Sequence, residues 1–99
     1  MAGKRDEYVA KLKKQLDAWN ADVERLGARA KAAKAEVKAQ YEQRVADLRE
    51  KRQDVERRLR DAREAGEGAW EALHQGLEDA GNALKSAIEK ARSEFKERE

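Results

Sequence analysis

Two glycines, Gly66 and Gly68, divide the chain into two long segments that each carry a helical pattern of apolar residues. Because the chain contains no proline, this pair is the strongest helix breaker in the sequence. If the chain turns here, it forms a helical hairpin with a long overhang; if it does not, it forms one straight rod. We favour the hairpin, because a connection of about two to five residues suits an antiparallel helix pair.

The composition is typical of long helices and coiled coils. Charged residues make up 44% of the 99 residues and aromatic residues only 5%, and alanine, glutamate, lysine, leucine and arginine dominate. So polar a composition is also found in disordered chains. The regular spacing of the apolar residues favours helices instead, so we expect an all-α fold with a single coiled-coil domain over residues 1–99.

The first segment, about residues 5–65, is predicted to form one continuous helix. From Val9 onward the apolar residues recur every three or four positions, which is the spacing of a coiled-coil seam. Gly27 is the interior weak point, since a glycine costs about 1 kcal/mol relative to alanine inside a helix. A turn at Gly27 would give a three-helix bundle, but an alanine-rich run follows it, and we expect the helix to continue.

After a turn at residues 66–68, with Gly66 and Gly68 as the hinge, residues 69–97 are predicted to form a second amphipathic helix. This helix folds back, and its apolar stripe meets that of the first helix as an antiparallel coiled-coil hairpin. The predicted seam residues are Val45, Leu48, Val55, Leu59, Trp70, Leu73, Leu77, Leu84, Ile88 and Phe95.

Such a hairpin leaves roughly residues 5–35 without a partner in the same chain. This overhang carries a series of apolar side chains, and burying each large one is worth about 1.5–3 kcal/mol. We therefore expect a homo-oligomer, most simply an antiparallel dimer whose overhangs pair. The predicted self-association residues, called the apolar row below, are Val9, Leu12, Leu16, Trp19, Val23 and Leu26.

Few residues suit catalysis or metal binding. The chain has neither cysteine nor threonine, and its only serines and histidine are Ser86, Ser93 and His74. A serine nucleophile needs a base and an orienting acid held in a pocket, which a thin helical rod does not offer. Glu71, His74 and Glu78 share one helix face, as in half of a di-iron carboxylate site, but they flank the apolar stripe. We expect no enzyme activity, no metal site and no cofactor.

Two surfaces suggest other partners. Residues 49–63 hold seven basic and four acidic groups, but the acids interrupt the field that phosphates need, and pairs such as Asp54–Arg58 absorb part of it. Nucleic acid is therefore not an expected partner. Residues 69–97 have an aromatic residue near each end, and such a helix can lie in a lipid interface. Because this segment is net acidic, packing on the first helix is favoured, and lipid- or granule-surface binding is the alternative.

The charge balance and the start of the chain indicate a cytoplasmic protein. The net charge is +2, from 23 basic and 21 acidic residues, so no strong field directs the chain to nucleic acid or membrane. Residues 1–7 contain no apolar run like that of a signal peptide. No segment approaches the roughly 20 apolar residues that span a bilayer.

Residues 4–13 (KRDEYVAKLK), continuing through Leu16, Asp17, Trp19 and Asn20, resemble the opening of small bacterial coiled-coil proteins catalogued as stress-response proteins. Residues 41–52 and 65–73 are similar to the same family, so the resemblance covers most of the chain. It implies a non-enzymatic, cytoplasmic, stress-associated role and brings no set of functional residues with it. With the apolar row, this predicts self-association and scaffold or protective binding of client proteins.

Overall fold

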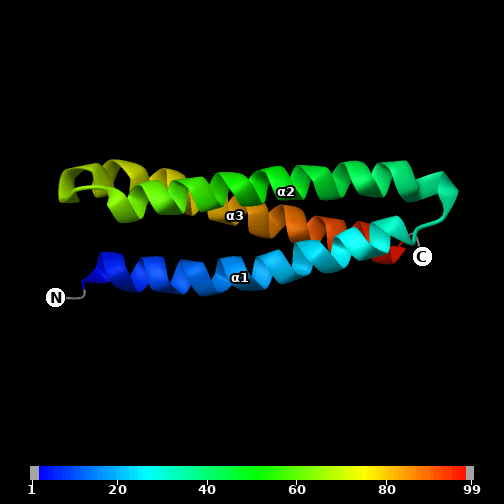
Figure 1. The fold of residues 1–99 in the computed structure, drawn as a ribbon, viewed down its shortest axis with the longest axis horizontal. Helices are drawn as coiled ribbons and strands as arrows, with labels where there is room; N and C mark the ends of the chain where they lie inside the picture. Colours follow the sequence, from blue (N-terminus) through cyan, green and yellow to red (C-terminus); the bar gives the residue numbers. More distant parts are fainter. Residues whose placement is uncertain (1–2, 98–99) are drawn as a thin grey trace.

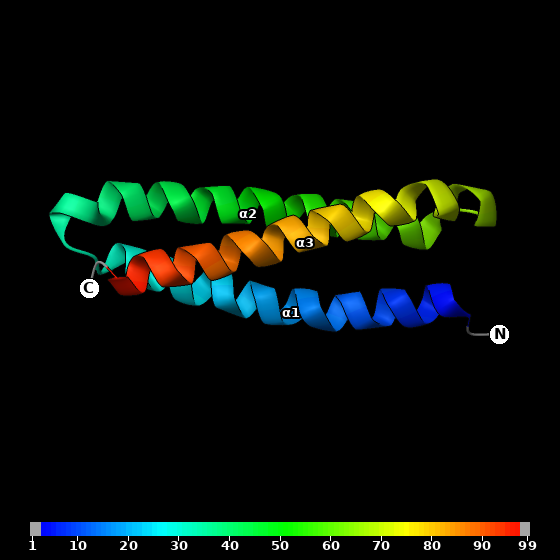
Figure 2. The ribbon, with the colours of Figure 1, turned by 180° about the vertical axis from the view of Figure 1, so that it is seen from behind.

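The computed structural model describes residues 3–97, which form three α-helices joined by two short connections. Helix α1 spans Lys4–Lys31, α2 spans Ala35–Glu64 and α3 spans Glu67–Glu97. The chain runs up, down and up, so α2 is antiparallel to both neighbours and α1 is parallel to α3 (Figures 1 and 2). The bundle is a rod of 52 × 18 × 16 Å. The expected all-α fold is confirmed for these residues.

Charges at the helix ends agree with the helix dipoles. Asp6 and Glu7 lie in the first turn of α1, and Arg29 and Lys31 lie in its last turn. Acidic groups near a helix N-terminus and basic groups near its C-terminus are each worth some tenths of a kcal/mol. The sequence therefore supports α1 at both ends, although Gly3 provides no side-chain cap at its N-terminus.

The core is one continuous apolar cluster along the axis of the rod. Leu48, Val55, Leu77 and Leu84 are fully buried, and within residues 3–97 no charged side chain is buried. The buried apolar residues are Leu12, Leu16, Val23, Leu26, Ala30, Tyr41, Val45, Leu48, Val55, Leu59, Ala62, Leu77, Leu84, Ile88, Ala91 and Phe95. All three helices contribute to this cluster, so none of them is an appendage.

The turn between α2 and α3 lies at Ala65 and Gly66, close to the predicted position. Gly66 accepts a hydrogen bond from the backbone N–H of Trp70 at 2.9 Å, and Gly68 already lies in the first turn of α3. No residue from 3 to 97 has a positive φ, and a Cβ added at Gly66 or Gly68 would meet nothing within 4 Å. The turn therefore uses the low helix propensity of glycine and not a left-handed backbone.

Helices α2 and α3 pack tightly along most of the predicted seam. Its residues Val45, Leu48, Val55, Leu59, Leu77, Leu84, Ile88 and Phe95 are buried, Trp70 is half-buried, and Leu73 is 37% exposed.

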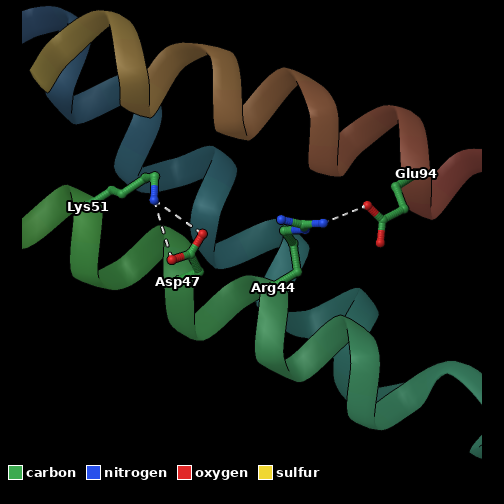
Figure 3. A network of polar contacts seen from close by, with 4 residues as sticks. All are labelled: Arg44, Asp47, Lys51 and Glu94. Carbon is green, nitrogen blue, oxygen red and sulfur yellow. Dashed lines mark hydrogen bonds and ion pairs between the residues drawn. The ribbon is translucent and has the colours of Figure 1, made fainter. Parts of the chain in front are cut away.

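At the far end of this helix pair, the ring of Tyr41 stacks on that of Phe95, with centroids 3.9 Å apart. The Tyr41 hydroxyl also donates a hydrogen bond to the Phe95 carbonyl oxygen at 3.3 Å. Nearby, Arg44 Nη2 lies 3.2 Å from Glu94 Oε2, while Lys51 pairs with Asp47 within α2 (Figure 3). The stacked rings and the Arg44–Glu94 pair hold the register of α2 against α3.

The expectation of one continuous helix over residues 5–65 is wrong. The helix is interrupted at Ala32, Ala33 and Lys34, so the two-helix hairpin with an overhang becomes a three-helix bundle. The break does not fall at Gly27, which is buried inside α1. A Cβ at Gly27 would lie 2.8 Å from Arg49 Nη2 and 3.7 Å from Val45 Cγ1, so the space beside this glycine is occupied by the end of the flexible Arg49 side chain.

The physical reason for the break is burial of the apolar row. Leu12, Leu16, Val23 and Leu26 are at most 6% exposed, and Val9 and Trp19 are half-buried against the same core. Each large side chain contributes about 1.5–3 kcal/mol on burial. Interrupting a helix for three residues costs less than several such burials, so α1 folds back onto the other two helices.

We predict that Leu48→Ala destabilises the fold by about 2–5 kcal/mol, because a fully buried leucine leaves a cavity when it is truncated. Leu73→Ala is the matched control and should cost about 1 kcal/mol or less, since this leucine is already partly in water. Urea unfolding followed by circular dichroism measures both losses. Equal losses at the two positions would contradict the observed core.

Candidate functional site

The interface between α1 and α3 is the most loosely packed of the three helix–helix interfaces. Three of the five aromatic residues of the chain, Tyr8, Trp19 and Trp70, lie along this interface and are each half-buried. Half-buried aromatic side chains between loosely packed helices make this the leading candidate for a binding surface.

At one end of this face, Arg5 of α1 fastens the start of the chain to the end of α2. Its Nη2 atom donates hydrogen bonds to the carbonyl oxygens of Ala62, Arg63 and Ala65 at 2.6, 2.9 and 2.5 Å. The last carbonyls of a helix lack partners in the helix and form the negative end of its dipole. The guanidinium therefore caps α2 from another helix.

Arg5 also contacts a cluster of three aromatic rings, those of Tyr8, Trp70 and His74. Its guanidinium carbon lies 5.4 Å from the centre of the Trp70 ring, within cation–π range. The Tyr8 ring stands edge-on to the rings of Trp70 and His74, with centroid distances of 5.8 and 4.8 Å. The centroids of the Trp70 and His74 rings are 5.0 Å apart. Arg5 and Tyr8 of α1 thus pack against Trp70 and His74 of α3. These contacts hold the two helices together near their N-terminal ends.

Beyond the rings, the two helices leave a shallow groove of about 310 Å³. Its lining combines apolar, amide and charged side chains of α1 and α3, namely Tyr8, Lys11, Leu12, Gln15, Trp19, Glu78, Gly81 and Asn82. A Cβ at Gly81 would lie 3.7 Å from Leu12 Cδ1 and 3.8 Å from the Trp19 ring. An alanine at position 81 would therefore make ordinary van der Waals contact with Leu12 and Trp19.

The surroundings of Tyr8 perturb the ionisation of its phenol. Burial raises the pKa of its phenol above 10.0, and the nearby Glu78 carboxylate raises this pKa further. The same carboxylate lies 3.9 Å from His74 Nε2. Tyr8 consequently presents a neutral hydroxyl at physiological pH, suited to a hydrogen bond and not to nucleophilic chemistry.

The arrangement of Ser86, Ser93 and His74 does not assemble a catalytic group. Both serines lie on exposed positions of α3, at least about 18 Å along the helix from His74. His74 is occupied by aromatic neighbours and Glu78, while Glu71 is exposed. No group of three or more metal-binding His, Cys, Asp or Glu side chains occurs within the described part of the chain.

The basic segment of α2 is largely paired with its own acids. Asp54 binds both Arg57, at 2.6 Å, and Arg58, at 3.1 Å, which confirms the predicted Asp54–Arg58 pair. Arg52 lies 3.4 Å from Glu24 of α1 and 3.5 Å from Glu56. These pairs reduce the positive field that a phosphate backbone would need.

The residues predicted for self-association face the core of their own chain, as described above. An overhang without a partner is therefore absent from the closed bundle of residues 3–97. The apolar stripe of α3 is likewise packed inward from Leu77 onward. Within residues 3–97, no helix combines the length and the apolar character needed to cross a bilayer.

Arg5 and Tyr8 were not singled out by the apolar spacing, although they build the contact between α1 and the other helices. Tyr8 precedes Leu12 by four residues, so it lies on the edge of the apolar stripe, where an aromatic ring is half-buried. That position was a usable signal. The contact of Arg5 with the end of α2 has no such signal in the sequence, because it depends on how α1 packs against the other two helices.

Comparison of the chain with protein-family models, with curated proteins and with solved structures gives no match.

Replacing Arg5 by lysine should loosen the ends of α1 and α2. Lysine keeps the charge but cannot reproduce the fork of donors or the flat contact with Trp70. We expect a loss of about 1 kcal/mol and faster amide exchange in the first turns of α1 and the last turn of α2. Arg25→Lys is the control, because Arg25 forms only an exposed pair with Asp22. Unchanged exchange at both helix ends would contradict this role of Arg5.

The raised pKa of Tyr8 predicts a specific loss of stability in alkali. The folded state favours the neutral phenol, so its contribution is complete below the unfolded pKa of about 10 and is lost as pH rises through the folded pKa. Raising the pH from about 9 to about 11 should therefore lower the midpoint of thermal unfolding more for the native chain than for Tyr8→Phe. A difference absorbance titration of the two proteins locates the Tyr8 transition. A Tyr8 transition below pH 10 would contradict the expectation.

Proposed function

We propose that this chain is a non-enzymatic, cytoplasmic, stress-associated protein that binds other protein chains, itself included, through the apolar row of α1. The observation that carries the proposal is the unequal packing of the bundle. The interface between α2 and α3 is the most extensive, while α1 meets α3 in the sparsest one. The α1–α2 interface is also less extensive than the α2–α3 interface, so α1 is the helix with the least packing against the other two and the one expected to open first.

Release of α1 would expose a surface suited to unfolded protein. Leu12, Leu16, Val23 and Leu26 are buried in the closed bundle, and they form a continuous apolar stripe once α1 is free. The opposite side of the core, on α2 and α3, would be exposed at the same time. Contiguous apolar patches of this kind are typical of protein–protein contacts.

The chemistry of the core supports exchange of one apolar partner for another. Within residues 3–97, Tyr41 is the one buried core residue whose side chain carries a polar group. The other shielded polar atoms, Asn20 Oδ1, Arg44 Nε and Arg52 Nε, belong to half-buried side chains at the rim of the core. Buried polar groups are the usual device that fixes one register and one partner. A core without them accepts any apolar helix of suitable size, which is the property that protective binding of varied clients requires.

A reversible lock on α1 tests this proposal. Position 27 of α1 faces position 45 of α2, since a Cβ at position 27 would lie 3.7 Å from Val45 Cγ1. The variant Gly27→Cys with Val45→Cys therefore places two cysteines on neighbouring helices, within reach of one disulfide. The chain has no other cysteine. We expect the reduced variant to suppress light scattering by a heat-denatured client enzyme at equimolar dose, and the oxidised monomer to lose most of that protection.

The reduced and oxidised forms of this variant are their own matched control, because they differ in one bond. If neither form protects the client, protective binding is excluded. If both forms protect equally, release of α1 is not the mechanism. Native protein should behave as the reduced variant does.

A further inference from the structure

The connection between α1 and α2 is made of residues that favour a helix. Ala32, Ala33 and Lys34 include neither glycine nor proline, and the surrounding segment, residues 28–39, reads ARAKAAKAEVKA. Alanine has the highest helix propensity and lysine and arginine are close behind it. The other connection contains Gly66. Only the first connection is thus formed against the local preference of its residues.

The backbone of this connection stays helical at Ala32 and leaves the helical conformation at Lys34. Ala32 has right-handed helical dihedral angles (φ −89°, ψ −1°), and its N–H donates to the Ala28 carbonyl oxygen at 3.2 Å. Lys34 has φ −62°, which a helix also uses, but ψ is 149°. Lys34 makes no side-chain cap for α2. Neither helix end therefore has the residues that normally terminate a helix.

The phase of the apolar stripe is also kept across the connection. Leu26, Ala30, Ala33, Val37 and Tyr41 follow one another at steps of four, three, four and four residues. In a bundle with a loop at residues 32–34, nothing requires α1 and α2 to share one helical phase. In a single continuous helix, this spacing places the apolar faces of α1 and α2 on one side.

A single chain cannot use this continuous helix without exposing the apolar row. A second copy removes the difficulty, because its α2 and α3 offer the surface that α1 occupies in the closed bundle. In such an arrangement every contact of α1 is recreated between copies, including Arg5 with the end of α2 and Arg52 with Glu24. Exchange of identical elements is a low-cost route to dimers for this reason.

We propose that two copies of this chain exchange α1, with residues 4–64 of each forming one continuous helix of roughly 90 Å. The two long helices run antiparallel and cross at Ala32–Lys34 on the two-fold axis, where small side chains permit close approach. Each α3 packs on the α2 of its own chain and the α1 of the other. This inference rests on the proposed function. It adds to that function the way in which two copies of the chain associate.

The closed monomer and the exchanged dimer have the same core, so the balance between them is set by concentration and by the connection. The dimer gains helical hydrogen bonds at residues 32–34 and loses the freedom of two separate molecules. Opening of α1 is the step that both exchange and client binding share. Conditions that release α1 should therefore speed the formation of the dimer.

The variant Ala35→Pro distinguishes the closed monomer from the exchanged dimer. Ala35 is the first residue of α2, where proline is well tolerated, and Lys34 before it already has the extended conformation that a following proline requires. In a continuous helix the same proline lies in the interior and breaks it. Because the dimer contains two such helices, we expect its dissociation constant to rise by about 10⁴-fold. Glu67→Pro, at the first position of α3, is the matched control and should leave the dimer unchanged.

The experiment is sedimentation at up to about 1 mM, after incubation near the midpoint of thermal unfolding, for the native chain and both proline variants. We expect native protein and Glu67→Pro to form a species of twice 11.3 kDa, and Ala35→Pro to stay monomeric. A native chain that remains monomeric, or a dimer equally strong in Ala35→Pro, overturns the exchange.

The cysteine pair at positions 27 and 45 gives a second readout. These positions lie about 27 Å apart along a continuous helix, so oxidation of the exchanged dimer must link two different chains. Covalent dimers on a non-reducing gel support the exchange, and a dimer with only intrachain disulfides overturns it while leaving self-association intact. The client assay repeated on Ala35→Pro tests protective binding separately, because α1 of this monomer can still open.

Discussion

Packing of α1 against the pair formed by α2 and α3 is the interaction on which the rest of the structure depends. Two helices alone leave one side of their apolar stripes in water, and a chain of 99 residues has little core to spare. The third helix closes that side, and Val23 and Leu48 become fully buried as a result. Without α1, the α2–α3 interface would remain, but the side of that helix pair which α1 covers would be exposed to water.

Polar contacts between the helices orient this packing and do not replace it. Arg44–Glu94 joins α2 to α3, Arg52–Glu24 joins α1 to α2, and Arg5 binds the last carbonyls of α2. The two ion pairs lie at the rim, where such pairs contribute about 1 kcal/mol or less. They favour one register among several that apolar stripes alone would permit. The core itself is formed almost entirely by apolar side chains, which is compatible with the proposed exchange of one apolar partner for another.

The connection at residues 32–34 is where local preference and tertiary packing oppose each other. The local sequence favours helix, whereas burial of the apolar row requires a turn. Natural sequences usually agree at both levels, and a conflict often marks a position with a functional role. In the proposed scheme the conflict has a purpose, because a second chain lets the segment be helical and the row be buried together.

The sequence by itself determined the helical content, the turn near Gly66 and the inward face of each helix. These properties follow from residue spacing and propensity, which act over a few neighbours: the steps of three and four through Leu12, Leu16 and Val23 suffice to predict a buried stripe. Local patterns also predicted the pair Asp54–Arg58. Only the tertiary structure decided which surface covers that stripe, and so whether the chain is interrupted after Lys31. The same holds for Arg5 and for the rings of Tyr8, Trp70 and His74, which meet because α1 returns along α3. Burial is a property of the assembled helices, and its free energy exceeded the preference of three helix-forming residues.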